Sequence, residues 1–556
     1  MLQNTSSDKD IVNLIVETTI ELGIKHVILS PGSRNAPLII AFANNKLFNC
    51  YSIIDERSAA YYALGMAKEL QQPVAIVCTS GTAALNYAPA LAEAFYQEIP
   101  IVAITADRPS EWIDHEDGQT IHQANIFNNY IKQSLSLPDE TLPNSTNIAQ
   151  AQLTKFVETF SQYPLGPAHI NVPLTEPLYN TTTHNYKPQT PFVATTPQKP
   201  NLEIIKSIWE KAEKVMIVVG FMQHNNILNQ LIGQLATTKN CVVIAPPLAN
   251  IDSATTNTPE SVILSMHNNT TPFTPNLLIT LGNAVVSKQL KFFLRKNKPQ
   301  YHIDIDLNPR KVDTYRALTH KIIADSNTAI KYIIDNCAAK NSYFVELWTN
   351  AAIKTTHITE QFQTKLAWSD FYAFSFIFKQ LTQYNYTINL HLANSTPVRF
   401  ADLFPKLPNV NYYCNRGTNG IEGCLSTAAG GSLTSPNLTL AIIGDVSFFY
   451  DSNCFYNNHL NKNFKVVVIN NGGGNIFNVL GYTSGMECAN YFTTPIGFSV
   501  KGICDTFSVQ HFKATTIAEL QNQWQKFIDC NYCSVLEIDT HNADNTMVLK
   551  DFFSQL

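Results

Sequence analysis

Charged side chains are scarce in this sequence of 556 residues. They make up 15% of it, against about 25% in an average soluble protein, and the formal net charge is −5. The 38 basic residues are scattered and form no lysine- or arginine-rich block, so we expect no nucleic-acid partner. The apolar content of 45% excludes an intrinsically disordered chain, because disorder goes with few apolar residues and a high net charge.

Long hydrophobic runs are also missing. No stretch approaches the roughly 18 apolar residues of a membrane-spanning helix. The opening residues, MLQNTSSDKD, lack the basic and apolar regions of a signal peptide. We therefore expect a cytoplasmic protein with no membrane partner. The 11 cysteines agree with this expectation, since their number is odd and their spacing irregular.

One cysteine pair, Cys530 and Cys533, has CxxC spacing. Because neither a second pair nor a pair of histidines accompanies it, the spacing is weak evidence for a zinc or redox site. The alternative interpretation is two ordinary thiols beside a turn that leads into an apolar strand at 534–538.

Short apolar runs alternate with helical stretches along the chain, which is typical of parallel sheets covered on both faces. In the first part, for example, a strand is expected over 73–78 and a single helix over 83–96. The sequence thus predicts an α/β protein of three doubly wound, mainly parallel domains, the first and third similar in layout. We place the domains at 1–185, 203–340 and 369–556, with a proline-rich linker at 186–202 and a connecting helical segment at 341–368.

The strongest chemical signal is in the third domain, where two apolar strands end in polar residues. LAIIGD ends at Asp445, and KVVVINN ends at Asn471, before three glycines at 472–474. Ligands sit at the carboxyl ends of strands in open α/β sheets, so these side chains are expected to meet at one edge. Their oxygens suit Mg²⁺, which completes its shell with water and phosphate oxygens, and the glycines allow close approach of a diphosphate. The alternative is a pair of ordinary strand-to-helix turns.

This combination of GD and NN, with 26 residues from Asp445 to Asn471, resembles the diphosphate-binding motif of thiamine-diphosphate enzymes. The family motif usually reads GDG, and Val446 replaces its last glycine here. Such enzymes also need a glutamate that binds N1′ of the aminopyrimidine ring. Glu56, in IIDERSAAYYALGMA, stands where the family places it. Taken alone, Glu56 is better explained as a first-turn carboxylate that the helix dipole favours, and the GD and NN motif reverses that preference.

Longer phrases narrow the resemblance to one subfamily, the 2-succinyl-5-enolpyruvyl-6-hydroxy-3-cyclohexene-1-carboxylate synthases of the menaquinone pathway. The phrases are SPGSRNAPL (30–38), TSGTAALNYAPALAEAFYQEIPIVAITADRP (79–109), NRGTNGIEGCLSTAAG (415–430) and GDVSFFYDSN (444–453). They cover the first and third domains well, whereas the middle domain matches only loosely. SPGSR together with NRGxxGI is the most specific part, because other thiamine-diphosphate decarboxylases lack both.

The resemblance implies a transferase that uses thiamine diphosphate and Mg²⁺ or Mn²⁺. Its reaction would be the decarboxylation of 2-oxoglutarate, followed by a Stetter-like 1,4-addition of the succinyl-semialdehyde carbanion to isochorismate. The resemblance also implies that the first domain binds the pyrimidine ring of the cofactor and the third its diphosphate. The active site would lie between subunits, so the protein would self-associate as a dimer or a tetramer.

The matched motifs imply the site residues as well. Both substrates carry two carboxylates, which arginine suits because its planar fork forms two parallel hydrogen bonds. The catalytic set is Glu56, Ser33, Arg34, Arg399 and Arg416. The substrate-binding set is Ser33, Arg34, Arg108, Gln119, Lys288, Ser395, Arg399, Arg416, Phe477 and Leu480. The cofactor-binding set is Glu56, Gly81, Ser395, Ile421, Asp445, Val446, Ser447, Asn471, Gly473, Asn475 and Ile476. The metal ligands would be Asp445, Asn471 and the backbone carbonyl of Gly473.

Several positions depart from the subfamily pattern. Gly472 and Asn475 stand where asparagine and glutamine are common, and Glu422 stands where aspartate is common. His122 replaces a basic residue, which makes the charge at that position depend on pH. These departures bear on substrate fit more than on cofactor binding.

Three other hypotheses compete with the synthase. The first keeps the cofactor but changes the acceptor, giving a 2-oxoacid decarboxylase or carboligase. The second is a Rossmann-like nucleotide-binding protein, but no strand here is followed by the glycine-rich fingerprint with an acidic residue about 20 positions later. The third is a non-catalytic homologue, against which the complete set of Glu56, Asp445 and Asn471 argues.

Overall fold

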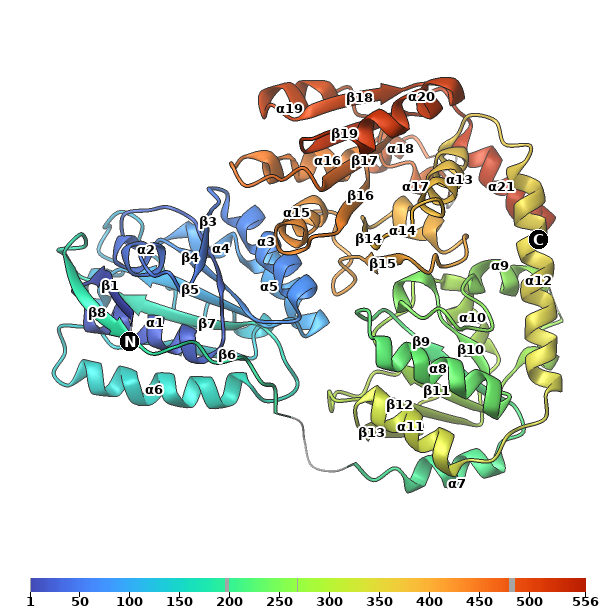
Figure 1. Cartoon of the computed structure of the whole chain (residues 1–556), viewed down its shortest axis with the longest axis horizontal. Coiled ribbons are helices and arrows are strands. Elements are labelled where there is room, and N and C mark those ends of the chain that lie inside the picture. The colour runs from blue at the N-terminus through green and yellow to red at the C-terminus, as the bar shows by residue number, and fades with distance from the viewer. Residues whose placement is uncertain (1, 196–199, 268, 480–485) are drawn as a thin grey trace. The chain divides into compact units, whose positions relative to one another are not determined.

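Three mainly parallel β-sheets, each flanked by helices, make up the protein (Figure 1). The computed structural model describes residues 2–195, 200–267, 269–479 and 486–556. The α/β fold class predicted from the alternation of apolar runs and helical stretches is thereby confirmed. A small antiparallel sheet also pairs β1 (Leu2–Ser7) with β8 (Thr181–Tyr186). The polar sequences LQNTSS and TTTHNY give no signal for this pairing.

The N-terminal sheet has six strands, and all but the two edge strands are mainly apolar and buried. They are β2 (His26–Leu29), β3 (Asn49–Ser52), β4 (Val74–Cys78), β5 (Ile101–Asp107), β6 (Gln133–Ser136) and β7 (Ala168–Pro173). The sheet order is β3-β2-β4-β5-β7-β6. The central strands β4 and β5 are buried at every position, as expected for strands covered on both faces.

Helices cover both faces of this sheet. They are α1 (Asp10–Glu21), α2 (Ala36–Ala43), α3 (Glu56–Leu70), α4 (Thr82–Leu85), α5 (Ala88–Gln97) and α6 (Ser145–Phe160). Helices α1, α2 and α6 share one apolar core with strand residues such as Val77 and Ile104, whereas α3 packs on β2 and β4 from the other face.

The prediction of a single helix over 83–96 is wrong. The chain instead forms α4 and α5, with a break at Asn86 and Tyr87. Pro89 occupies one of the first two positions of α5. Proline suits the first turn of a helix but lacks the N–H that an uninterrupted helix needs, so a new helix begins beside it.

The middle sheet is built from five parallel strands. They are β9 (Val215–Val219), β10 (Val242–Ile244), β11 (Leu277–Leu281), β12 (Tyr301–Asp306) and β13 (His320–Ile323), in the order β10-β9-β11-β12-β13. The flanking helices are α7 (Glu203–Lys211), α8 (Asn226–Lys239), α9 (Pro259–Ser265), α10 (Lys288–Lys296) and α11 (Ser326–Asn336). The long helix α12 (Tyr343–Gln363) then leads from this sheet toward the C-terminal one (Figure 1).

The C-terminal sheet again has six strands. They are β14 (Ile388–Leu392), β15 (Val410–Tyr413), β16 (Leu438–Gly444), β17 (Phe464–Asn470), β18 (Gln510–Ala514) and β19 (Ser534–Asp539). The helices are α13 (Asp370–Leu381), α14 (Thr396–Ala401), α15 (Cys424–Thr434), α16 (Asp445–Tyr450), α17 (Ile476–Val479), α18 (Ala489–Thr493), α19 (Val500–Thr506), α20 (Ile517–Ile528) and α21 (Asn545–Gln555). The order β15-β14-β16-β17-β19-β18 repeats that of the N-terminal sheet, since both read 2-1-3-4-6-5 when numbered within the sheet.

Helix α15 packs along α3, and glycines permit the close contact. A Cβ atom on Gly65 of α3 would lie 1.9 Å from the carbonyl oxygen of Thr427, and one on Gly430 of α15 would lie 2.1 Å from that of Tyr62. Both neighbours are backbone atoms, which cannot rotate away as a side chain can. The helix contact therefore requires glycine at both positions.

None of the helices in the described part of the chain is long and apolar enough to cross a membrane. All 11 cysteines are free thiols, and Cys533 is buried next to β19. Among the described residues, no group of three or more His, Cys, Asp or Glu side chains could hold a metal ion.

We expect the substitution Gly65→Ala to lower the free energy of unfolding by at least about 1–3 kcal/mol, because the added methyl group must push α3 and α15 apart. Glycine-to-alanine changes inside helices otherwise stabilise by about 1 kcal/mol, so the expected sign is the reverse of the usual one. Urea denaturation measures the effect. Gly502→Ala, in exposed α19 where a Cβ makes only ordinary contacts, is the control and should be neutral or stabilising.

Candidate active site

The candidate residues lie directly after strands of the two six-stranded sheets. Four follow successive strands β2, β3, β4 and β5 of the N-terminal sheet, and four follow β14, β15, β16 and β17 of the C-terminal sheet. In this order they are Arg34, Glu56, Gly81 and Arg108, then Ser395, Arg416, Asp445 and Asn471. Because each sheet is mainly parallel, its four residues share the edge at which open α/β sheets bind ligands.

Glu56 is the first residue of α3. Asp55 caps this helix by accepting a hydrogen bond from the backbone N–H of Ser58, which leaves the Glu56 side chain at the start of the first turn. The carboxylate is half-buried, and the side-chain amide of Asn86 lies 3.5 Å from its Oε2. Burial raises the pKa of Glu56 above its ordinary value. A carboxyl group with a raised pKa is suited to exchanging a proton near neutral pH.

Arg34 and Arg108 both lie near the Trp112 ring. The guanidinium carbons stand 5.8 and 5.5 Å from the ring centroid. Arg34 is only 2% exposed and donates to the carbonyl of Leu174 at 2.8 Å. Burial and the neighbouring charge of Arg108 both lower the pKa of Arg34. Two guanidinium groups so close together favour an anion between or beside them.

Each of these two cations has an acidic neighbour. Glu176 lies 3.5 Å from Arg34, and Asp117 lies 3.6 Å from Arg108. The buried Nε atoms of both arginines have no hydrogen-bond partner among the described residues. An unpaired buried donor is costly, so these nitrogens are the expected contacts of a bound carboxylate.

Gly81 and Gln119 lie against each other at the same edge. Gly81 has φ +86°, and a Cβ atom there would come 3.1 Å from the Cα of Gln119. Gln119 and Ser33 are exposed at this edge. Sequence reasoning missed Gln123, a fully buried side chain whose Oε1 accepts from the N–H of Gly81 at 2.7 Å. No motif marks Gln123, because its partners are distant in sequence.

Asp445 organises the glycine turn of the C-terminal sheet. Its Oδ2 accepts hydrogen bonds from the backbone N–H groups of Gly472 and Gly473, at 2.9 and 2.7 Å. Its Oδ1 accepts from the N–H of Val446 at 2.8 Å. Burial raises the pKa of Asp445, while these three hydrogen bonds lower it. The carboxylate thus joins the ends of β16 and β17, as expected from the GD and NN motifs.

Asn471 is held by a residue that sequence reasoning missed. Its Nδ2 donates to Oδ2 of Asp370 at 2.7 Å, and Thr540 donates to the other carboxylate oxygen at 2.6 Å. Asp370 is buried, and burial raises its pKa to about 6. An ionised carboxylate only accepts hydrogen bonds, so the amide nitrogen faces Asp370 and the amide oxygen is left for a ligand. Asp370 reads in the sequence as an ordinary first-turn carboxylate of α13.

The remaining cofactor-side candidates cluster around the glycine turn. Ser447 is buried in α16, and the carbonyl of Gly473 accepts from the N–H of Asn475 at 2.8 Å. Ile476 begins α17, and the Phe477 ring lies 5.8 Å from that of Phe492. Leu480, predicted as a pocket wall, lies outside the described residues.

Lys288 and Arg399 line one small cavity of about 110 Å³, together with Ile476 and the acidic Glu260 and Asp402. Residues that follow the middle sheet and the C-terminal sheet therefore both contribute to it. The sequence around Lys288 matches the subfamily poorly, yet the structure brings this residue beside a candidate arginine.

Ser395, at the start of α14, has φ 74° and ψ −123°, a backbone conformation that is strained for any residue with a side chain. The strain is held by the surrounding structure. Such outliers cluster at functional sites, and this one immediately precedes the helix that carries Arg399.

Arg416 and Ile421 lie on a loop between β15 and α15 that packs with the N-terminal domain. The buried side chain of Asn415 donates to the hydroxyl of Thr427 at 2.9 Å. Glu422, one of the departures from the family pattern, accepts from the hydroxyl of Tyr61 at 3.2 Å. Another departure, His122, is exposed and lies 3.0 Å from Asp114.

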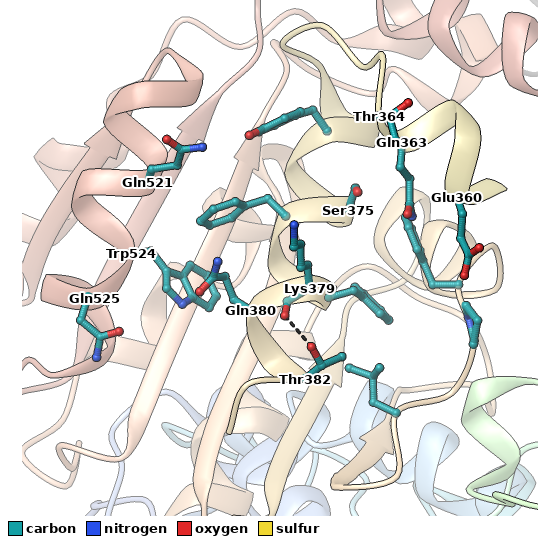
Figure 2. A pocket seen from close by; sticks show the side chains of 16 residues that line it. Glu360, Gln363, Thr364, Ser375, Lys379, Gln380, Thr382, Gln521, Trp524 and Gln525 are labelled. Carbon is teal, nitrogen blue, oxygen red and sulfur yellow. Dashed lines mark hydrogen bonds between the residues drawn. The ribbon is translucent and has the colours of Figure 1, made fainter. Parts of the chain in front are cut away.

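A larger cavity, of about 860 Å³, lies between α13 and α20. Figure 2 shows Lys379 and Gln380 of α13 opposite Trp524 and Gln521 of α20. None of the predicted site residues lines this cavity. The candidate chemistry therefore lies elsewhere, at the strand ends.

Comparison with known proteins agrees with this geometry. Residues 9–126 match the family described as "Thiamine pyrophosphate enzyme, N-terminal TPP binding domain". The 2-succinyl-5-enolpyruvyl-6-hydroxy-3-cyclohexene-1-carboxylate synthase of Flavobacterium psychrophilum is 38% identical over 548 residues, covering 98% of each chain. The enzyme of that name from Flavobacterium johnsoniae is 36% identical over 560 residues, again covering 98% of each. The chain belongs to this synthase family.

The resemblance deduced from the sequence phrases is thus confirmed. A solved structure described as benzoylformate decarboxylase from Polynucleobacter necessarius superposes with a TM-score of 0.66 and covers 96% of this chain and 98% of its own. It is only 15% identical, so it shows the shared fold alone. As a member of the synthase family, the protein is an enzyme that uses thiamine diphosphate, as predicted.

The residues present fit the cofactor and a divalent ion. Asp445 supplies a buried carboxylate, and Asn471 presents its amide oxygen because Asp370 holds the nitrogen. Beside them, a Cβ atom on Gly444 would meet open space, so the strand end leaves room for phosphate oxygens. Hard oxygen ligands next to a space for a diphosphate are what Mg²⁺ requires.

Asp451 provides a pH-dependent anchor for the start of α15. It is completely buried and accepts from both the N–H and the hydroxyl of Ser426, each at 2.7 Å. Burial raises its pKa to about 6, above the value of about 3.9 in an unfolded chain. Between these values the folded protein binds more protons than the unfolded one, so raising the pH destabilises it.

We therefore expect the free energy of unfolding to fall by roughly 3 kcal/mol between pH 4 and pH 7 relative to an Asp451→Asn variant, since each unit of pKa is worth about 1.4 kcal/mol. Urea denaturation of both proteins across this range measures the difference. A difference that does not change with pH would contradict the prediction.

Proposed function

We propose that the protein catalyses the thiamine-diphosphate-dependent condensation of 2-oxoglutarate with isochorismate in menaquinone biosynthesis. The products are CO₂ and 2-succinyl-5-enolpyruvyl-6-hydroxy-3-cyclohexene-1-carboxylate. The observation that carries the proposal is that Arg34 and Arg108 both have a buried Nε atom without a hydrogen-bond partner among the described residues. They stand on the same sheet edge as Glu56, in a chain of the synthase family.

The chemistry of the two substrates matches this site. Loss of CO₂ from 2-oxoglutarate leaves its former keto carbon to bond with the ring carbon β to the isochorismate carboxylate. One proton is then taken up at the α carbon. Bound thiamine diphosphate supplies the electron sink for this step. The protein supplies the cations that hold the carboxylates and the groups that move protons.

We assign acceptor binding to the N-terminal sheet edge. Arg34 and Arg108 would each hold a carboxylate of isochorismate through two parallel N–H groups of the guanidinium. Ser33 and Gln119 would be further donors. Glu56, whose raised pKa permits proton exchange, would bind and polarise the aminopyrimidine ring. Ile421 would hold the cofactor in its bent form.

We assign the diphosphate and the donor substrate to the C-terminal half. Asp445, Asn471 and the carbonyl of Gly473 would hold Mg²⁺ or Mn²⁺. Gly81, Val446, Ser447, Asn475 and Ile476 would complete the cofactor contacts. Ser395, Arg399 and Arg416, with Lys288, would bind the carboxylates of 2-oxoglutarate, and Phe477 and Leu480 would form apolar walls.

The location and the assembly remain proposals as well. We propose a cytoplasmic enzyme that self-associates as a dimer or a tetramer, as the sequence resemblance implies. Analytical ultracentrifugation of the purified protein decides the assembly, and a monomer that retains full activity would contradict an active site shared between subunits.

The decisive assay incubates metal-stripped protein with isochorismate and 2-oxoglutarate, with and without thiamine diphosphate and Mg²⁺. We expect the diene absorbance of isochorismate to disappear only when both cofactors and 2-oxoglutarate are present. If CO₂ is released while isochorismate persists, the acceptor is a different molecule and the decarboxylase or carboligase alternative holds. If folded protein does neither, the catalytic assignment fails.

The substitution Glu56→Gln should lower kcat at least about 100-fold, because a positioned acid–base group contributes about 10²–10⁴-fold to the rate. The variant should still bind thiamine diphosphate, and quenching of the tryptophan fluorescence measures this binding. Glu69→Gln makes the same chemical change at the opposite end of α3 and should leave kcat unchanged. Full activity of the Glu56 variant would remove this residue from the mechanism.

A further inference from the structure

Glu93 is a buried carboxylate that the mechanism does not yet use. It lies in α5, and its side chain is 1% exposed. Of the other buried residues of this helix, Ala90, Leu91 and Ala94 are apolar and only Gln97 is polar. An ionised group in such a place is costly unless donors surround it, so its partners indicate what it does.

Four donors converge on the two oxygens of Glu93. Oε1 accepts from the backbone N–H of Gly417 at 2.7 Å and from the side-chain amide of Gln97. Oε2 accepts from both the backbone N–H and the hydroxyl of Thr418, each at 2.6 Å. Three of these four donors belong to the loop that carries Arg416 and Ile421.

The hydrogen bonds to Glu93 fix the loop that carries Arg416 and Ile421. Gly417 and Thr418 directly follow Arg416 in the chain. A Cβ atom on Gly417 would lie 2.6 Å from the backbone oxygen of Glu93, so the loop approaches α5 as closely as glycine allows. The preceding residue, Asn415, is held separately by Thr427. The backbone on both sides of Arg416 is therefore anchored.

We propose that Glu93 is a positioning residue that holds loop 415–421 in the conformation in which Arg416 binds the donor substrate. This role rests on the proposed function, because it gives Arg416 a carboxylate of 2-oxoglutarate to bind. Glu93 does not itself touch the substrate. It accepts from two consecutive backbone N–H groups, which only an acceptor with two oxygens can do together with the other two donors.

Glutamine is the sharpest substitution because it keeps the shape and removes one acceptor. In Glu93→Gln, the amide nitrogen must face either Gly417 and Gln97 or the two donors of Thr418. The amide N–H groups of the glutamine then face the donors of the loop or of Gln97, and the loop has to shift. We expect the KM for 2-oxoglutarate to rise at least about tenfold, as for a buried donor left unsatisfied, while the KM for isochorismate stays within about twofold of the wild-type value.

A double-mutant cycle separates positioning from general destabilisation. In an Arg416→Ala background, Glu93→Gln should add less than about twofold to the KM for 2-oxoglutarate, because the residue it positions is gone. A merely structural role would add the same factor in both backgrounds, and that result would overturn the proposal.

The matched control is Asp304→Asn, which makes the same change at a buried carboxylate that Lys321 and Thr280 contact in the middle sheet. It should lower stability without changing the KM for 2-oxoglutarate. If Glu93→Gln does not fold, Thr418→Val carries the test. It removes one donor of the four and should raise this KM about threefold.

Failure of the proposal and failure of the proposed function give different results. Wild-type protein that does not consume isochorismate with 2-oxoglutarate contradicts the proposed function itself. Active wild-type protein with an unchanged KM for 2-oxoglutarate in Glu93→Gln, or in Thr418→Val if the first variant does not fold, overturns the role of Glu93 alone.

Discussion

Parallel strands buried on both faces impose the constraint on which the site depends. Strands such as β4 and β5 are apolar at almost every position because helices cover them above and below. The candidate site residues therefore gather where the strands end rather than within the sheets. Every candidate from Arg34 to Asn471 that follows a strand obeys this rule, which explains why residues more than 70 positions apart share one edge in each of the two sheets.

Buried carboxylates give these edges their shape. Asp445 holds the glycine turn at 472–473, Asp370 turns the amide of Asn471, and Glu93 holds the loop beyond Arg416. In each case an acceptor that cannot donate fixes the direction of backbone or amide N–H groups. The cost of burying these charges is offset by two to four hydrogen bonds each, and the raised pKa of Asp370 shows that the compensation is incomplete.

The sequence predicted the elements whose patterns leave no competing interpretation. The strand expected over 73–78 is found as β4 at 74–78, because a continuous apolar run defines a buried strand. The prediction of a single helix over 83–96 was wrong, because Pro89 lies in the first turn of a second helix. Sequence reasoning missed Gln123, Asp370 and Glu93, because their roles depend on partners that only the tertiary fold brings near. The catalytic and binding roles taken from motifs stay predictions.

The shared strand order of the two six-stranded sheets has an evolutionary consequence. Two scaffolds of one topology carry different candidate site residues at corresponding strand ends: Glu56 and Arg416 follow the second strand, and Arg108 and Asn471 follow the fourth. Under the proposed function, substitutions on one scaffold would change the acceptor that is recognised without disturbing the diphosphate site on the other. Such modularity allows a lineage to acquire new carbon–carbon bond chemistry while it inherits its cofactor unchanged.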